Sequence, residues 1–192
     1  MPDDAPPAGP SPEPADAEAI VQAVEAGTDG IHVPEELLVE PEETKVRPAE
    51  AQSLYARILA MGTGEKIKLA LRGNKDVRLI LARDPARLVR RLVLMNPRIT
   101  DAEVIAVARN RSADEELLRL ITQKREWMRN YQVRLALVTN PKTPLAISMR
   151  QLPTLGERDI RALAKSKNVP QAVATQARRM IASRQLPGGS GE

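Results

Sequence analysis

Few side chains of this 192-residue sequence have the types and spacing that catalysis needs. His32 is the only histidine, it lies between Ile31 and Val33, and the sequence has no cysteine. Metal sites need clustered His, Cys or carboxylate side chains. The densest carboxylates lie in residues 35–43 and 114–116, and we interpret them as solvated charge and as negative charge at helix N-termini. We therefore expect no enzyme, no metal and no cofactor.

Residues 62–66, Gly-Thr-Gly-Glu-Lys, bear a slight likeness to a phosphate-binding loop. That loop has the spacing G-x-x-x-x-G-K-[ST] and follows a strand, and this sequence has neither feature here. We interpret the segment as a turn between two helices.

Aromatic and basic side chains are better candidates, and the chemistry they favour is binding. Trp127 and Tyr131 lie four positions apart, on one face of a predicted helix over residues 124–139, with Arg125 and Arg129 beside them. Trp, Tyr and Arg are frequent interface anchors, and they also stack on nucleic-acid bases. A lone tryptophan in a helical protein often fills the core instead, so both roles stay open.

A second group of candidates is basic. Arg78, Arg90 and Arg134 occupy one position of a short repeated motif. They either line up as a basic stripe on the surface or donate hydrogen bonds to carbonyl groups near Asp84 or Asn140. We favour the second role. Basic residues near the C-terminal end are better candidates for a positive surface. The partner-binding candidates are Arg125, Trp127, Arg129, Tyr131, Lys165, Lys167, Arg178, Arg179 and Arg184. The candidates for a structural role in the repeat are Arg78, Arg90, Arg134, Asn96, Asn140, Pro97 and Pro141.

Charge is divided unevenly along the chain. Residues 1–50 contain 2 Lys+Arg and 13 Asp+Glu, a net charge of −11, whereas residues 51–192 contain 27 and 12, a net charge of +15. This asymmetry indicates interaction with a polyanion or an acidic partner. The alternative is that Lys and Arg only solvate the outer faces of short helices.

Residues 1–47 are acidic and rich in proline, and we predict a largely disordered tail with a short helix over 16–26. Within this tail, residues 28–43 alternate acidic and apolar side chains. That composition is typical of a linear motif that a partner binds, or of a strap that lies on the basic domain.

The remainder predicts an all-α fold, because no segment shows sustained period-two alternation and the apolar residues are almost all aliphatic. A basic helical-repeat domain over 48–184 precedes a flexible C-terminus over 185–192. Proline, glycine and asparagine–proline signals delimit about ten short helices. We place them at residues 49–61, 65–72, 76–83, 86–95, 100–109, 112–123, 124–139, 144–152, 157–165 and 171–183.

Shifting the sequence by 56 residues aligns helix ends and apolar positions. The matches are Asn74 with Asn130, Val77 with Val133, Arg78 with Arg134, Pro85 with Pro141, Pro97 with Pro153, and Ala106 with Ala162. We interpret this as an internal duplication of a unit of about four short helices that stack as a short solenoid.

The motifs Asp84-Pro85, Val89-Arg90, Asn96-Pro97 and Asn140-Pro141 resemble the leucine-rich-repeat-variant class and, more loosely, HEAT and armadillo repeats. The resemblance covers about residues 62–182, although the copies lie 12 and 44 residues apart and so break the regular period of that class. It implies a helical superhelix with a binding surface and no fixed activity.

The sequence thus predicts a non-catalytic interaction scaffold whose basic surface binds an acidic protein segment, with its own residues 28–43 as an autoinhibitory occupant. The alternative is a helical-repeat protein that contacts nucleic-acid phosphates through Lys and Arg. No apolar run is long enough to span a membrane, and the N-terminus lacks the features of a signal peptide. We therefore expect a cytoplasmic protein.

Overall fold

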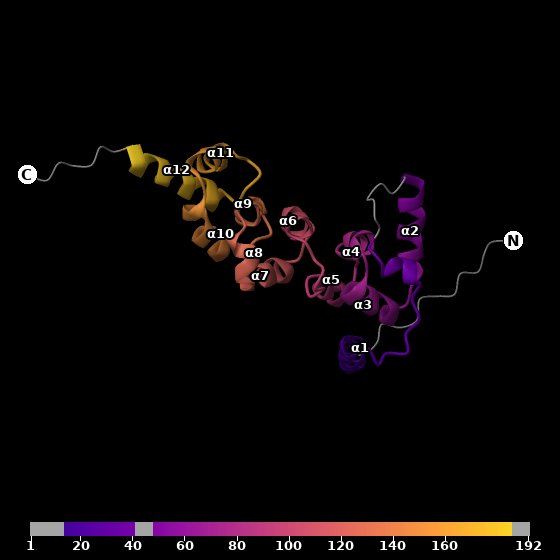
Figure 1. Cartoon of the computed structure of the whole chain (residues 1–192). Helices are drawn as coiled ribbons and strands as arrows, with labels where there is room; N and C mark the ends of the chain where they lie inside the picture. The colour runs from indigo at the N-terminus through magenta and orange to yellow at the C-terminus, as the bar shows by residue number, and fades with distance from the viewer. Residues whose placement is uncertain (1–13, 41–47, 186–192) are drawn as a thin grey trace, which may run out of the picture. The chain divides into compact units, whose positions relative to one another are not determined.

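The computed structural model describes residues 14–40 and 48–185, and all regular elements among these residues are helices, with no strand (Figure 1). This confirms the all-α prediction. The chain divides into two compact units, with the boundary between Ile99 and Thr100. The sequence analysis predicted a helical-repeat domain over residues 48–184, which includes parts of both units. Residues 186–192 of the predicted flexible C-terminus lie outside the described residues, as do residues 1–13 and 41–47 of the predicted tail.

In the first unit the helices pack around α3. The elements are α1 (Pro14–Ala26), the 3-10 helix η1 (Glu35–Leu37), α2 (Pro48–Ala60), α3 (Thr63–Arg72), α4 (Lys75–Leu81) and α5 (Arg87–Val93). α3 contacts α1, α4 and α5, and its Ile67, Leu69 and Ala70 are fully buried. One aliphatic core joins these helices to the N-terminal segment.

The second unit is built from further short helices. They are α6 (Asp101–Arg109), α7 (Glu115–Gln123), α8 (Arg125–Arg129), α9 (Tyr131–Thr139), α10 (Leu145–Gln151), the 3-10 helix η2 (Leu152–Thr154), α11 (Glu157–Lys165) and α12 (Gln171–Gln185). α9 packs on α6 and α10, and α12 packs on α10 and α11. Leu152, Ile160 and Val173 are fully buried in the core beneath α11 and α12.

Residues 14–40 differ from the disordered tail that the composition predicted. α1 begins two residues before the predicted helix and contacts α3. Val24, Val33 and Leu37 are at most 6% exposed and belong to the core of the first unit. These few apolar side chains are enough to fix the segment because α3 and α4 supply both an apolar surface and the opposite charge.

Two helix boundaries correct the sequence prediction. The single helix expected over 124–139 is wrong, because Asn130 has a non-helical ψ of 120° and its side chain accepts a hydrogen bond from the Gln132 amide, which ends α8 and begins α9. α7 begins after Asp114 rather than at Ser112. The pattern Thr100-x-x-Glu103 forms a capping box at the start of α6: the Thr100 hydroxyl accepts from the Glu103 amide, and the Glu103 carboxylate accepts from the Thr100 amide.

Buried asparagines fix the ends of several helices. Asn140 precedes a proline, which disfavours a helical backbone, and its ψ is 120° at the end of α9. Its Nδ2 donates to the carbonyls of Ala108 and Asn110 at 2.8 and 2.9 Å, and its Oδ1 accepts from the Lys142 amide at 2.9 Å. Asn140 is 2% exposed, and these bonds satisfy one buried and one partly buried carbonyl at the end of α6.

The same arrangement occurs in the first unit. Asn96 also precedes a proline, its Nδ2 donates to the carbonyl of Ala70 at 3.0 Å, and its Oδ1 accepts from the Arg98 amide. Asn74, at the start of α4, donates through Nδ2 to the carbonyls of Glu36 and Val39.

We expect Asn140→Ala to lower the free energy of unfolding by about 1–3 kcal/mol, because it leaves buried carbonyls without a donor. The measurement is urea denaturation followed by circular dichroism. Asn168→Ala is the matched control, since Asn168 is an exposed loop asparagine, and we expect it to change stability by less than about 0.5 kcal/mol. Equal stability of the two variants would contradict the role assigned to Asn140.

Candidate binding surfaces

The first candidate surface is the face of the first unit that its own N-terminal segment covers. We call residues 28–40 the strap. The Asp29 carboxylate pairs with the Lys68 ammonium at 2.6 Å, and the same ammonium donates to the Ile31 carbonyl at 2.6 Å. The Asp29 and Lys68 side chains are only 4% and 15% exposed. Ile31 also lies against Gly64, where an added Cβ would stand 3.3 Å from its Cδ1.

The other end of the strap contacts α4. Glu40 accepts a hydrogen bond from the Arg78 guanidinium at 2.7 Å and another from the Lys75 amide at 2.9 Å. Arg78 is 2% exposed, so its charge is compensated by Glu40 rather than by water. Near this same end of the strap, Arg98 donates to the Leu38 carbonyl at 2.9 Å. An acidic and partly apolar segment is therefore bound by cations of α3, α4 and the loop after α5.

These contacts change the acidity of the two strap carboxylates. The hydrogen bond from Lys68 lowers the pKa of Asp29 below its ordinary value of 3.8, and this outweighs the opposing effect of burial. Burial of Glu40 disfavours its charge, but hydrogen bonds from Arg78 and from the Lys75 amide outweigh burial and lower its pKa below 4.5.

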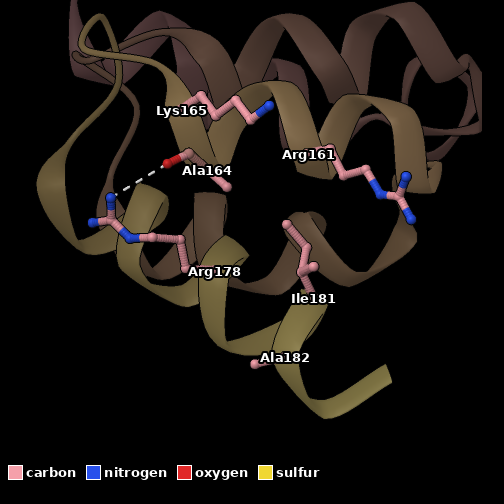
Figure 2. Close-up of a pocket in the computed structure, with 6 residues that line it drawn as sticks. All are labelled: Arg161, Ala164, Lys165, Arg178, Ile181 and Ala182. Carbon is pink, nitrogen blue, oxygen red and sulfur yellow. Dashed lines mark hydrogen bonds between the residues drawn. The ribbon is translucent and has the colours of Figure 1, made fainter. Parts of the chain in front are cut away.

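The second candidate surface is a groove of about 500 Å³ between α11 and α12. Ala164, Ile181 and Ala182 form its apolar floor, and Arg161, Lys165 and Arg178 line it with positive charge (Figure 2). All three cations are exposed. Arg178 donates to the Thr175 hydroxyl at 3.2 Å and, more weakly, to the Ala164 carbonyl, while Arg161 pairs with Glu157.

The charge around this groove is one-sided. Residues 160–185 contain six Lys and Arg and no Asp or Glu. The predicted surface residues Lys165, Lys167, Arg178, Arg179 and Arg184 belong to this stretch and are all exposed. Of these, Lys165 and Arg178 line the groove.

The predicted aromatic face does not form. Trp127 lies in α8 and Tyr131 in α9, on different helices, and Trp127 is 6% exposed, so its ring is buried. Lys124 lies over the Trp127 ring at 4.2 Å. Arg125 and Arg129, the other two candidates of this segment, are exposed.

Tyr131 is bound within the second unit through its hydroxyl. The hydroxyl donates to the Asp159 carboxylate and accepts from the Gly156 amide at 3.0 Å. The hydrogen bond to Asp159 raises the pKa of Tyr131 above 10.0. The hydroxyl thus connects α9 to the start of α11.

The three arginines of the repeated motif donate to backbone carbonyls five or six residues before them. Arg78 donates to Gly73, Arg90 to Asp84 and Pro85, and Arg134 to Met128 and Arg129. For Arg134 the acceptors lie at the end of α8, before the arginine, rather than near Asn140 as the sequence had indicated.

Sequence reasoning missed several residues of both surfaces. Lys68 and Arg98 belong to no motif in the sequence, and only their contacts with the strap identify them as binding residues. Arg161 could have been found, because it lies four positions before Lys165 on the predicted helix over 157–165 and therefore on the same face.

Comparison with protein-family models, curated proteins and solved structures gave no match. No helix in the described part of the chain has the length and apolar character to cross a membrane. Among the described residues, no three His, Asp or Glu side chains gather as metal ligands would.

The lowered pKa values of Asp29 and Glu40 predict that the first unit loses stability at acidic pH. A carboxylate whose pKa is lower in the folded state contributes stability that is complete above its unfolded pKa and is lost as pH falls through the folded value. For Asp29 and Glu40 this loss therefore begins near pH 4.5 and continues below pH 3.8. We expect the double variant Asp29→Asn/Glu40→Gln to be less stable than the wild type at pH 7 and nearly equal to it at about pH 2. Urea denaturation at both pH values measures this, and a difference that does not depend on pH would contradict the assignment.

We expect Tyr131→Phe to lower the free energy of unfolding by about 1–2 kcal/mol, because the Asp159 carboxylate and the Gly156 amide both lose their partner. Tyr55→Phe is the control, since Tyr55 is 48% exposed, and it should be neutral. Thermal unfolding at pH 7 compares the two, and an unchanged melting temperature for Tyr131→Phe would refute the role of its hydroxyl.

Proposed function

We propose that this protein is a non-catalytic interaction scaffold whose basic helical surface binds an acidic, partly apolar protein segment. The observation that supports this most directly is the strap. Its Asp29 and Glu40 pair with Lys68 and Arg78, while its Val33 and Leu37 are buried in the core of the first unit. The first unit thus already binds a segment of the proposed composition, supplied by the same chain.

We also infer that the chain is a short helical-repeat protein of the solenoid class, made by duplication of one template. Helix starts support this inference: α4, α6 and α7 begin at residues 75, 101 and 115, and α9, α11 and α12 begin 56 residues later at 131, 157 and 171. Side-chain geometry supports it too. Asp84 and Asn140, also 56 apart, each accept a hydrogen bond from the amide two residues later.

Binding of nucleic acid is the second candidate function, and the run of six cations without a carboxylate over 160–185 favours it. The strap argues for the protein ligand, because it docks through buried apolar side chains as well as through carboxylates. Nucleic-acid phosphates would engage the cations but leave the apolar surface without a partner.

Self-masking by the strap follows from the proposal. An intramolecular segment competes at a high effective concentration with any external ligand. Deleting residues 1–47 would also remove Val24, Val33 and Leu37 from the core, so a single substitution in the strap is the cleaner way to release it.

We expect Leu37→Ala to raise the affinity of the full chain for an added peptide of residues 28–40 at least about tenfold. The substitution removes a strap side chain that is 3% exposed, and truncations of this kind cost about 2–5 kcal/mol of packing energy. Fluorescence anisotropy with a labelled peptide measures the dissociation constant.

The matched control is Val39→Ala, in the same strap but with a side chain that is 58% exposed; it should bind the peptide as the wild type does. Circular dichroism establishes that each variant is folded, and Glu40→Gln serves as the milder release variant should Leu37→Ala unfold. Equal affinities of released and control variants would refute self-masking.

A further inference from the structure

The two candidate surfaces differ in how their positive charge is balanced. In the first unit, Lys68 and Arg78 are paired with Asp29 and Glu40 of the strap. In the second unit, the cations of the groove between α11 and α12 lie in a stretch with no Asp or Glu between residues 160 and 185. The only ion pair found there among the described residues joins Arg161 to Glu157, which is itself exposed at the first turn of α11.

We propose that the α11–α12 groove is a docking site for an acidic peptide that places an apolar side chain between carboxylates. This inference rests on the proposed function and assigns it a second site, separate from the one that the strap occupies. The groove lies entirely within the second unit.

The geometry of the groove fits such a ligand. Arg161 and Lys165 are one helical turn apart on α11 and therefore share a face, and Arg178 of α12 lines the groove together with them. In Figure 2, Ile181 lies between Arg161 and Arg178. The volume of about 500 Å³ accommodates a few side chains rather than a folded domain.

Arg178 has contacts with both helices of the groove. Its guanidinium donates to the Thr175 hydroxyl at 3.2 Å and lies 3.4 Å from the Ala164 carbonyl, a bond drawn in Figure 2. A guanidinium whose position is fixed by such contacts loses less freedom on binding a carboxylate than a mobile one does. Arg178 is therefore the main carboxylate anchor, and Lys165 supplies a second charge across the groove.

The strap shows which peptide this chemistry accepts. Its carboxylates at Asp29 and Glu40 bind cations, while Val33 and Leu37 between them are buried. A floor of Ala164, Ile181 and Ala182 offers apolar contact to a side chain placed in the same way. Single-stranded nucleic acid is the poorer fit, because its binding relies on aromatic side chains that stack on bases, and neither α11 nor α12 contains an aromatic residue.

The experiment uses the full chain and a labelled peptide of residues 28–40 as the ligand. The comparison peptide has Asn and Gln in place of its four carboxylates, and a labelled oligothymidine represents nucleic acid. The groove variant is Lys165→Glu/Arg178→Glu. The control variant, Lys142→Glu/Arg158→Glu, makes the same change of net charge at two exposed residues of the second unit that do not line the groove.

We expect the groove variant to bind the acidic peptide at least about tenfold more weakly than the wild type, and the control variant to stay within about twofold. The neutral peptide should bind the wild type weakly. Raising NaCl from about 0.05 to about 0.5 M should weaken binding only in part, because the apolar contact is not screened.

Several outcomes would overturn the proposal. If the groove variant and the control variant weaken peptide binding equally, the effect comes from net charge and the groove is not a binding site. Peptide binding that the groove variant retains refutes the groove but leaves the proposed function standing. Failure of the wild type to bind the acidic peptide also refutes the groove alone, because the strap still covers the first unit. The proposed function fails as well only if the released variant Leu37→Ala does not bind the acidic peptide either. A further outcome is that the wild type binds oligothymidine tightly but does not bind the peptide. If the groove variant then loses oligothymidine binding and the control variant keeps it, the groove is a nucleic-acid site instead.

Discussion

Short helices depend on partners for the backbone groups at their ends. Each helix leaves four amides and four carbonyls without intrahelical bonds, and in helices such as α4, α5 and α10, each of seven residues, these are a large share of the backbone. In this protein buried side chains supply the missing bonds. Asn96 and Asn140 donate to carbonyls at the ends of α3 and α6, and Arg90 and Arg134 donate to carbonyls of the segments just before their own helices.

The same dependence explains the strap. Residues 28–40 have little regular structure of their own beyond η1, and their carbonyls are bonded by Asn74, Lys68 and Arg98. Acidic side chains at both ends add ion pairs to cations that are themselves largely buried. Charge therefore has a structural task in the first unit, where it fixes the segment in place. Around α11 and α12 no such segment is present in the described residues, and the cations remain exposed.

Much of the helical pattern was predictable, because its signals are local. The predicted helix over 157–165 coincides with α11, and Thr100 caps α6 as its sequence indicates. The break at Asn130 was not found, because Trp127 to Val138 keeps an apolar pattern that a continuous helix would also show. From the sequence, docking of the strap on the basic domain was one of two interpretations of residues 28–43. The docking depends on pairs such as Asp29 with Lys68, which lie 39 residues apart, and a local sequence pattern does not indicate such pairs. Lys165 and Arg178 were predicted as surface cations from charge alone, but the apolar residues between them could be placed only from the packing of α11 on α12.

The burial of Trp127 has a practical consequence. It is the single indole of the chain, it lies in the second unit, and its ring is shielded below Lys124. The tryptophan emission, excited selectively over tyrosine, therefore reports on the second unit only, with a blue-shifted maximum while that unit is folded. Far-ultraviolet dichroism reports on both halves. The two signals together separate the melting of the second unit from that of the first without any added label.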